Sequence, residues 1–202
     1  MTANARAPRS KRWFRVAMIK LFSLKQEKEK AAAAAASGEG KIAPGLIRMQ
    51  KDVSELKKEK GVEIDFYNGK ADLMNFKVKI SPDDGFHAGG HFTFDVKVPN
   101  TYPHDAPKVL CETLVFHPNI DMEGHVCLNI LREDWKPVLT ISSVIMGLQF
   151  LMLEPNADDP LNKEAANMLA GNRRQFAETV KRSFRGGPMM INGKQYDFPR
   201  QG

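Results

Sequence analysis

Cys127 and Asn119 are the residues whose types and spacing best suit a chemical reaction. An ordinary cysteine thiol has a pKa of about 8.5 and is mostly protonated at neutral pH. It is still an adequate nucleophile toward a thioester, because exchange of one sulfur for another is close to isoenergetic. Asn119 precedes Cys127 in a proline-bounded turn, and a side-chain amide beside an attacked carbonyl stabilises the oxyanion by roughly 3–4 kcal/mol. This pair favours chemistry on a thioester.

Two other interpretations of Cys127 compete. Leucine and isoleucine follow it closely, and a lone cysteine in such company is commonly a small buried hydrophobic residue. A cysteine protease would use His125, but its ring must reach the sulfur and be oriented by a third group. Side chains two residues apart on an extended segment point to the same side, but this spacing does not usually bring an imidazole ring such as that of His125 against the sulfur of Cys127. We expect His125 to be exposed and His117 to tie its turn to the backbone.

The segment between Pro99 and Pro137, which holds these residues, lacks any regular periodicity. A stretch this long with little regular structure is usually either functional or disordered. Its many prolines stand beside aromatic and aliphatic residues, which argues against disorder. We expect an ordered segment that carries the site.

Elements with clear periodicity flank this segment. A helix is predicted from near Pro44, with apolar residues up to Leu56 at helical spacing and an end near Gly61. Alternating apolar residues then predict three strands joined by short loops, with a fourth short strand around Val109. The predicted strands are 62–66, 76–80 and 92–98. Short connections favour an antiparallel meander with one face on the core.

Three further helices are predicted after the irregular segment. Thr140 suits the N-cap of a buried helix through Leu151. Asp159-Pro160 predicts the start of a helix through Leu169, and Asn172 that of another through Phe184. A helix, a meander and then helices define an α+β domain, predicted here over residues 42–202. The pattern leaves open whether the chain past Arg185 packs or dangles.

The positive charge of the chain belongs to its first 41 residues. These hold ten Lys/Arg and three Asp/Glu, whereas the remaining residues hold 20 and 21 and are nearly neutral. Six alanines at 31–36 and a Ser-Gly-Glu-Gly run provide no apolar face, so residues 1–41 are predicted to be a disordered basic extension. A nucleic-acid binder would carry its basic stripe on the folded domain, so no nucleic-acid partner is expected.

Cysteine, histidine and hydropathy patterns exclude other classes of protein. Two cysteines without a CxxC pair point to a reducing compartment rather than a disulfide scaffold. The five histidines lack the spacing of a zinc site, so no metal is expected. The most apolar stretch, 141–153, is too short and too interrupted to cross a bilayer, so no membrane partner is expected.

The first 26 residues lack any acid and carry seven Lys/Arg, as a mitochondrial transit peptide does. The alternative is a solvated basic arm, with the native start of translation at Met18. We favour this alternative and expect a cytoplasmic and nuclear protein.

His117-Pro118-Asn119, Gly124 and Cys127 together resemble the active-site signature of the ubiquitin-conjugating enzymes. The resemblance covers roughly residues 44–185 in colinear order. It includes the proline-rich turn at 99–107, Trp135-Lys136-Pro137 and the run from Glu154 to Leu161. Ala106 stands where the family commonly has proline, which implies a slightly looser turn.

The resemblance implies a ubiquitin-conjugating-enzyme fold of four antiparallel strands and about four helices. It also implies roles for individual residues. Cys127 receives the C-terminal glycine of a ubiquitin-like modifier as a thioester, and Asn119 supports the oxyanion or holds its loop during lysine attack. Asp159 matches the family's acidic residue that orients the lysine. His117 and Pro118 are structural, and an N-cap role for Asp159 before Pro160 remains open.

Within this family, residues 127–140 and 159–166 resemble the enzymes that conjugate the Nedd modifier. The segment that begins at Met18 resembles their N-terminus, which docks on a heterodimeric activating enzyme. The resemblance implies a docking segment near 18–30, since apolar anchors on a polar arm suit a peptide that folds on binding. The anchors are Met18, Ile19, Leu21, Phe22 and Leu24. Residues 1–17 are a departure, because these enzymes begin at the position of Met18 and offer an acetylated N-terminal methionine to a DCN-like co-ligase, which an internal Met18 cannot do.

The implied partners are the Nedd modifier, its activating enzyme, RING-type ligases and cullins. No cofactor is expected on the chain itself, since the activating enzyme uses the ATP. Two alternatives stay open: a conjugating enzyme of the same fold for ubiquitin itself, and a non-catalytic binding module. The second would normally lack the nucleophile, so Cys127 with Asn119 and Asp159 counts against it.

Overall fold

The computed structural model describes residues 43–201 of the chain. The basic extension predicted over residues 1–41 lies outside the described residues. So do the predicted start at Met18 and the five docking residues, Met18, Ile19, Leu21, Phe22 and Leu24.

Four antiparallel strands form a meander in the order β1-β2-β3-β4. Their bounds are Val62–Phe66 for β1, Asn75–Ile80 for β2, Phe92–Lys97 for β3 and Lys108–Cys111 for β4. The register opposes Val78 to Phe94 and to Ile64, so alternate residues of neighbouring strands share the buried face. Charged pairs such as Lys77–Glu112 occupy the opposite face. Each strand therefore follows the alternation in its sequence.

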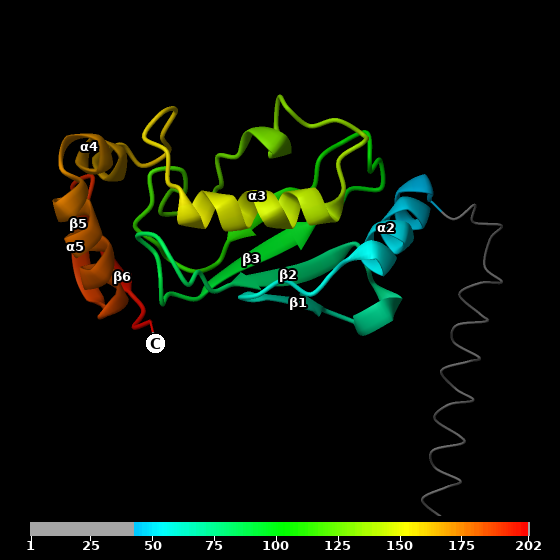
Figure 1. Cartoon of the computed structure of the whole chain (residues 1–202), viewed down its shortest axis with the longest axis horizontal. Coiled ribbons are helices and arrows are strands. Elements are labelled where there is room, and N and C mark those ends of the chain that lie inside the picture. Colours follow the sequence, from blue (N-terminus) through cyan, green and yellow to red (C-terminus); the bar gives the residue numbers. More distant parts are fainter. Residues whose placement is uncertain (1–42, 202) are drawn as a thin grey trace, which may run out of the picture. The chain divides into compact units, whose positions relative to one another are not determined.

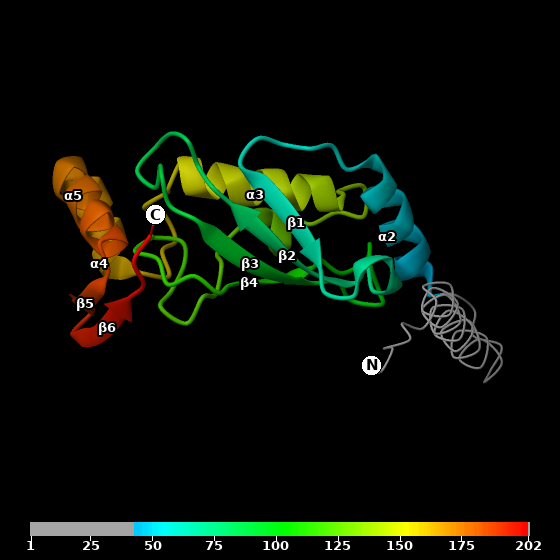
Figure 2. The same ribbon diagram turned by 90° about the horizontal axis from the view of Figure 1, so that it is seen from below.

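Helix α3, Ile141–Leu153, lies across one face of this sheet (Figures 1 and 2). The Thr140 hydroxyl accepts the Ser143 N–H at 3.3 Å, and the Ser143 hydroxyl accepts the Thr140 N–H in return. This capping box fixes where the helix begins. Six side chains of α3 are buried in the main core with those of the sheet: Ile141, Val144, Ile145, Leu148, Leu151 and Met152.

Helix α2, Pro44–Glu55, is tied to the start of α3 by a buried carboxylate. Asp52 is 3% exposed and accepts hydrogen bonds from Arg48 Nε at 2.8 Å, the Ile141 N–H at 3.1 Å and the Tyr102 hydroxyl. The Arg48 guanidinium also donates to the Pro137 carbonyl at 3.0 Å. A buried charge is tolerated only when it is paired and hydrogen-bonded, and Asp52 meets both conditions.

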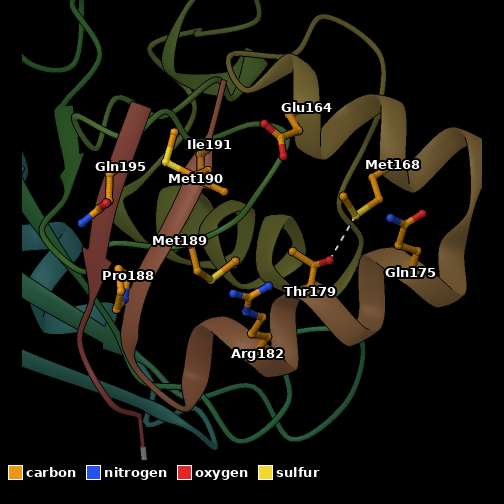
Figure 3. A pocket seen from close by; sticks show the side chains of 10 residues that line it. All are labelled: Glu164, Met168, Gln175, Thr179, Arg182, Pro188, Met189, Met190, Ile191 and Gln195. Carbon is orange, nitrogen blue, oxygen red and sulfur yellow. Dashed lines mark hydrogen bonds between the residues drawn. The ribbon is translucent and has the colours of Figure 1, made fainter. Parts of the chain in front are cut away.

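A second core lies at the end of the domain away from α2 (Figures 1 and 2). It contains α4 (Lys163–Gly171), α5 (Arg173–Phe184) and a hairpin of β5 (Gly187–Ile191) and β6 (Lys194–Phe198). Asn192 and Gly193 have positive φ of 50° and 77°, which suits a two-residue hairpin turn. Side chains of α4, α5 and the hairpin face one another around a pocket of about 510 Å³ (Figure 3).

The α+β class, the four-stranded antiparallel meander and the four helices of the described residues confirm the predicted fold. Two details differ, and the structure answers the question that the sequence left open about the chain past Arg185. Helix α4 begins at Lys163 rather than near Asp159, because the Asn162 side chain caps it by accepting the Ala165 N–H at 3.2 Å. Helix α2 ends at Glu55, since Leu56 is extended. The chain past Arg185 forms the hairpin, and the Asn-Gly pair is its sequence signal.

Phe176 is fully buried at the centre of the second core. Phe176→Ala should lower the free energy of unfolding by about 3–5 kcal/mol, since it removes buried apolar area and leaves a cavity. Urea denaturation measures the change. Met146→Ala is the control, because Met146 is 60% exposed, and it should change stability by less than about 1 kcal/mol. Equal losses in the two variants would contradict the assigned core.

Candidate active site

His117 fixes the turn that precedes the cysteine. Its ring is fully buried, and Nε2 lies 3.0 Å from the Leu151 carbonyl oxygen at the end of α3. Nδ1 lies 3.0 Å from the Asn119 backbone N–H, which can only donate. Nδ1 is therefore the acceptor, and Nε2 carries the proton that Leu151 accepts. Burial first, and the neighbouring His87 second, hold the pKa of His117 well below its usual range, so the ring is neutral.

Asn119 links this turn to two other segments. Its carbonyl oxygen accepts the Cys127 N–H at 2.8 Å, and its side-chain Oδ1 accepts the Asn156 N–H at 3.0 Å. Because the Asn156 N–H can only donate, Oδ1 rather than Nδ2 must face it. The Nδ2 hydrogens remain for the pocket that Asn119 lines together with Cys127. An oxyanion stabiliser needs a fixed donor of this kind.

The carbonyl of Pro118 holds the loop that carries Asp159. It accepts the N–H groups of Leu161 at 2.9 Å and Asn162 at 3.0 Å. Asp159 is exposed and has a positive φ of 45°, so the chain turns sharply there. Asp159 is not the N-cap of α4, because Asn162 has that role. The alternative N-cap interpretation of Asp159 is therefore wrong.

Cys127 lies with Asn119 and Asp159 in the lining of a pocket of about 280 Å³. Its side chain is partly exposed, and the Nη1 of Arg132 lies 3.6 Å from its sulfur. Phe150, Glu154 and Asp158 also line the pocket. Cys111, in contrast, is buried, and burial raises the pKa of its thiol to about 12. Of the two thiols, Cys127 is the one within reach of a large substrate.

His125 is exposed, and its hydrogen-bond partner is Asp121 rather than Cys127. The His125 Nδ1 lies 2.8 Å from Asp121 Oδ2, on the same turn that Gly124 shapes with its positive φ of 90°. A cysteine protease needs an imidazole hydrogen-bonded to its thiol. His125 does not supply that arrangement.

His87 packs against His117 and so supports the site, a role that the sequence did not indicate. Its ring is fully buried, with its centroid 4.9 Å from that of His117, and Nε2 lies 3.1 Å from the Phe116 carbonyl oxygen. Burial lowers the pKa of His87 to about 4, so this ring is neutral too. In the sequence it stands in a glycine-rich connection, where a histidine is usually exposed. Nothing local distinguishes it from a turn residue.

Within residues 43–201, no three His, Cys, Asp or Glu side chains come together in a way that could hold a metal ion. In the same part of the chain, no helix has both the length and the apolar character needed to cross a membrane.

Comparisons with known proteins agree with this geometry. The family model described as ubiquitin-conjugating enzyme matches residues 48–184, more than half of the chain. The Nedd8-conjugating enzyme UbcE2M of Drosophila melanogaster is 55% identical over 84% of this chain and 93% of its own length. A probable NEDD8-conjugating enzyme Ubc12-like of Arabidopsis thaliana is 51% identical over 91% and 99%. The solved structure of S. cerevisiae Ubc12 covers 88% of this chain and 97% of its own, with 39% identity and a TM-score of 0.73.

The chain therefore belongs to the ubiquitin-conjugating enzyme family. The predicted family and fold are confirmed, and so is the prediction that the chain is a conjugating transferase.

The buried imidazole of His87 makes stability depend on pH. Its folded pKa of about 4 lies below the ordinary 6.5, so between these values only the unfolded state binds the proton. Its contribution is complete above about pH 6.5 and is lost as pH falls, by about 1.4 kcal/mol per pH unit. Urea denaturation should therefore show His87→Phe losing about 2 kcal/mol less than the unchanged protein between pH 6.5 and 5. Equal losses in both proteins would contradict a neutral, buried His87.

Proposed function

We propose that this chain accepts the ubiquitin-like protein Nedd8 as a thioester on Cys127 and transfers it to lysine side chains. Two observations support the proposal. Cys127 shares a pocket with the amide of Asn119 and the carboxylate of Asp159, and relatives 51–55% identical over most of their length are named Nedd8-conjugating enzymes. The shared pocket supports the thioester chemistry, and the names of the relatives support Nedd8 as the modifier.

The first step loads the cysteine. The Cys127 sulfur attacks the glycyl carbonyl that the activating enzyme holds as a thioester. A new C–S bond forms, the old one breaks, and the activating enzyme recovers its thiol. The partly exposed Cys127 offers its sulfur to this exchange, whereas the buried Cys111 does not.

The second step moves the modifier to lysine. A neutral lysine amine attacks the carbonyl carbon, and negative charge develops on the carbonyl oxygen. The Nδ2 hydrogens of Asn119 are the donors for that oxygen, because Oδ1 is engaged by Asn156. Asp159 lines the same pocket, where a carboxylate orients the incoming ammonium and favours loss of its proton.

The proposed partners follow from the resemblance to Nedd8-conjugating enzymes. A heterodimeric activating enzyme supplies the modifier and uses the ATP, so the chain needs no cofactor of its own. We propose that residues 18–30 dock on that enzyme through Met18, Ile19, Leu21, Phe22 and Leu24. We propose cullins as substrates, and RING-type ligases and a DCN-like co-ligase as the proteins that assist transfer to them. Two cysteines without a CxxC pair fit a reducing compartment, so we place the protein in the cytoplasm and nucleus.

A charging assay tests this function. The protein is incubated with ATP and either Nedd8 or ubiquitin, each with its own activating enzyme, and run on a gel without reductant. Nedd8 should give an adduct that reductant removes, and ubiquitin should give little. Cys127→Ala should abolish the adduct, because it removes the nucleophile.

Cys111→Ala is the matched control and should charge normally, since Cys111 is 4% exposed. Preferential charging with ubiquitin would assign the chain to the second candidate, a ubiquitin-conjugating enzyme in the strict sense. Absence of an adduct with both modifiers would leave a non-catalytic module of the same fold.

A further inference from the structure

Arg132 is brought to the cysteine by a tight turn of the backbone. After Cys127 the chain forms the short 3₁₀ helix η2, Asn129–Leu131. The Asn129 carbonyl then accepts the N–H groups of both Arg132, at 2.9 Å, and Asp134, at 3.0 Å. The chain thus reverses within five residues, and the Arg132 side chain returns to the sulfur, with Nη1 3.6 Å from Sγ.

The turn is anchored at its far end. Trp135 donates its ring Nε1–H to the Pro103 carbonyl at 2.8 Å, and its backbone N–H lies 3.2 Å from the Arg132 carbonyl. The indole also packs against the buried ring of Tyr102, with centroids 5.8 Å apart. The backbone that carries Arg132 is therefore held by groups other than its charge, so a substitution of the exposed Arg132 side chain should leave the turn intact.

The guanidinium has no competing carboxylate in the described part of the chain. Glu133 and Asp134 follow Arg132 directly, yet neither forms a salt bridge with it there. The acidic side chains that line the pocket, Glu154, Asp158 and Asp159, do not pair with it either. The hydrogen bond of the Arg132 side chain among residues 43–201 goes to the sulfur of Cys127.

We propose that Arg132 is a catalytic residue that stabilises the Cys127 sulfur as it leaves during transfer to lysine. This inference rests on the proposed function. In that step the amine nitrogen forms a C–N bond to the glycyl carbonyl carbon, and the amine proton passes to solvent or to Asp159. The C–S bond breaks, and its electron pair goes to Sγ. The Nη1–H of Arg132 points at the atom that gains the charge.

The Arg132–Cys127 contact is stronger with the departing thiolate than with the thioester. In the thioester the sulfur is neutral and a weak acceptor, whereas the departing thiolate is an anion beside a permanent cation. The interaction is thus stronger in the transition state than in the ground state, which is the condition for a rate effect. Since Arg132 is exposed and solvent screens its charge, we expect an effect of about five- to tenfold.

Single-turnover discharge tests the proposal. Charged protein is separated from the activating enzyme and mixed with free lysine, and loss of the thioester is followed over time. Arg132→Gln should charge fully but discharge about five- to tenfold more slowly. Arg132→Lys should recover most of the rate, because it restores the positive charge. Lys108→Gln, which removes an exposed cation from β4, should discharge normally.

Ionic strength separates an electrostatic role from a structural one. Added salt should slow discharge of the unchanged protein more than that of Arg132→Gln, because it screens the Arg132 charge in addition to the acidic groups that both proteins share. Arg132→Gln discharging at the normal rate, or keeping the normal salt dependence, would overturn the proposal. In a second arm, Cys127 is loaded chemically with a short glycyl-glycine thioester, without activating enzyme or modifier. The same ratio of rates is expected there, so a wrong modifier assignment leaves Arg132 tested.

Discussion

The hydrogen bonds of one buried, neutral imidazole set the geometry of the site. His117 donates through Nε2 to the Leu151 carbonyl at the end of α3 and accepts through Nδ1 from the Asn119 N–H. Both bonds need the same tautomer, and a protonated ring would lose the second, because Nδ1 could no longer accept. Burial keeps the ring neutral, since a charged imidazole in this environment would be poorly solvated. The position of the partly exposed Cys127 thiol therefore depends on a side chain that is itself fully buried.

The residues that follow His117 hold the rest of the site through hydrogen bonds of their backbone carbonyls. Pro118 offers the carbonyl that holds the loop carrying Asp159, and Asn119 offers the carbonyl that holds Cys127. Gly124 lets the hairpin between them approach β4, because a Cβ there would lie 2.1 Å from the Cys111 carbonyl oxygen. Segments far apart in the sequence thus converge on one pocket, which brings the Cys127 thiol, the Asn119 amide and the Asp159 carboxylate together.

Periodicity predicted the helices and strands that form from signals in their own local sequence. The strands follow an alternation that already matches one buried face, and Thr140 begins α3 through a local capping box. Local signals failed where tertiary contacts decide. Asp159-Pro160 predicts the start of a helix. In the structure the Pro118 carbonyl holds that loop in a turn, and the helix begins at Lys163. Residue types, spacing and the family resemblance predicted that Cys127 and Asn119 lie together, as their shared pocket shows. The burial of His87 and the position of the Arg132 side chain depend on contacts that the sequence does not show.

We propose that the side-chain amide of Asn119 stabilises the charge that develops when lysine attacks the Cys127 thioester. His117 fixes the Asn119 backbone N–H, and the Asn156 N–H fixes the side-chain oxygen. Single-turnover discharge of Asn119→Ala onto free lysine tests this claim most directly. Loading of the cysteine should be unchanged, and discharge should slow by about 10²–10³-fold, the usual cost of losing one oxyanion donor. Discharge at the normal rate from a folded, fully charged Asn119→Ala protein would contradict the claim.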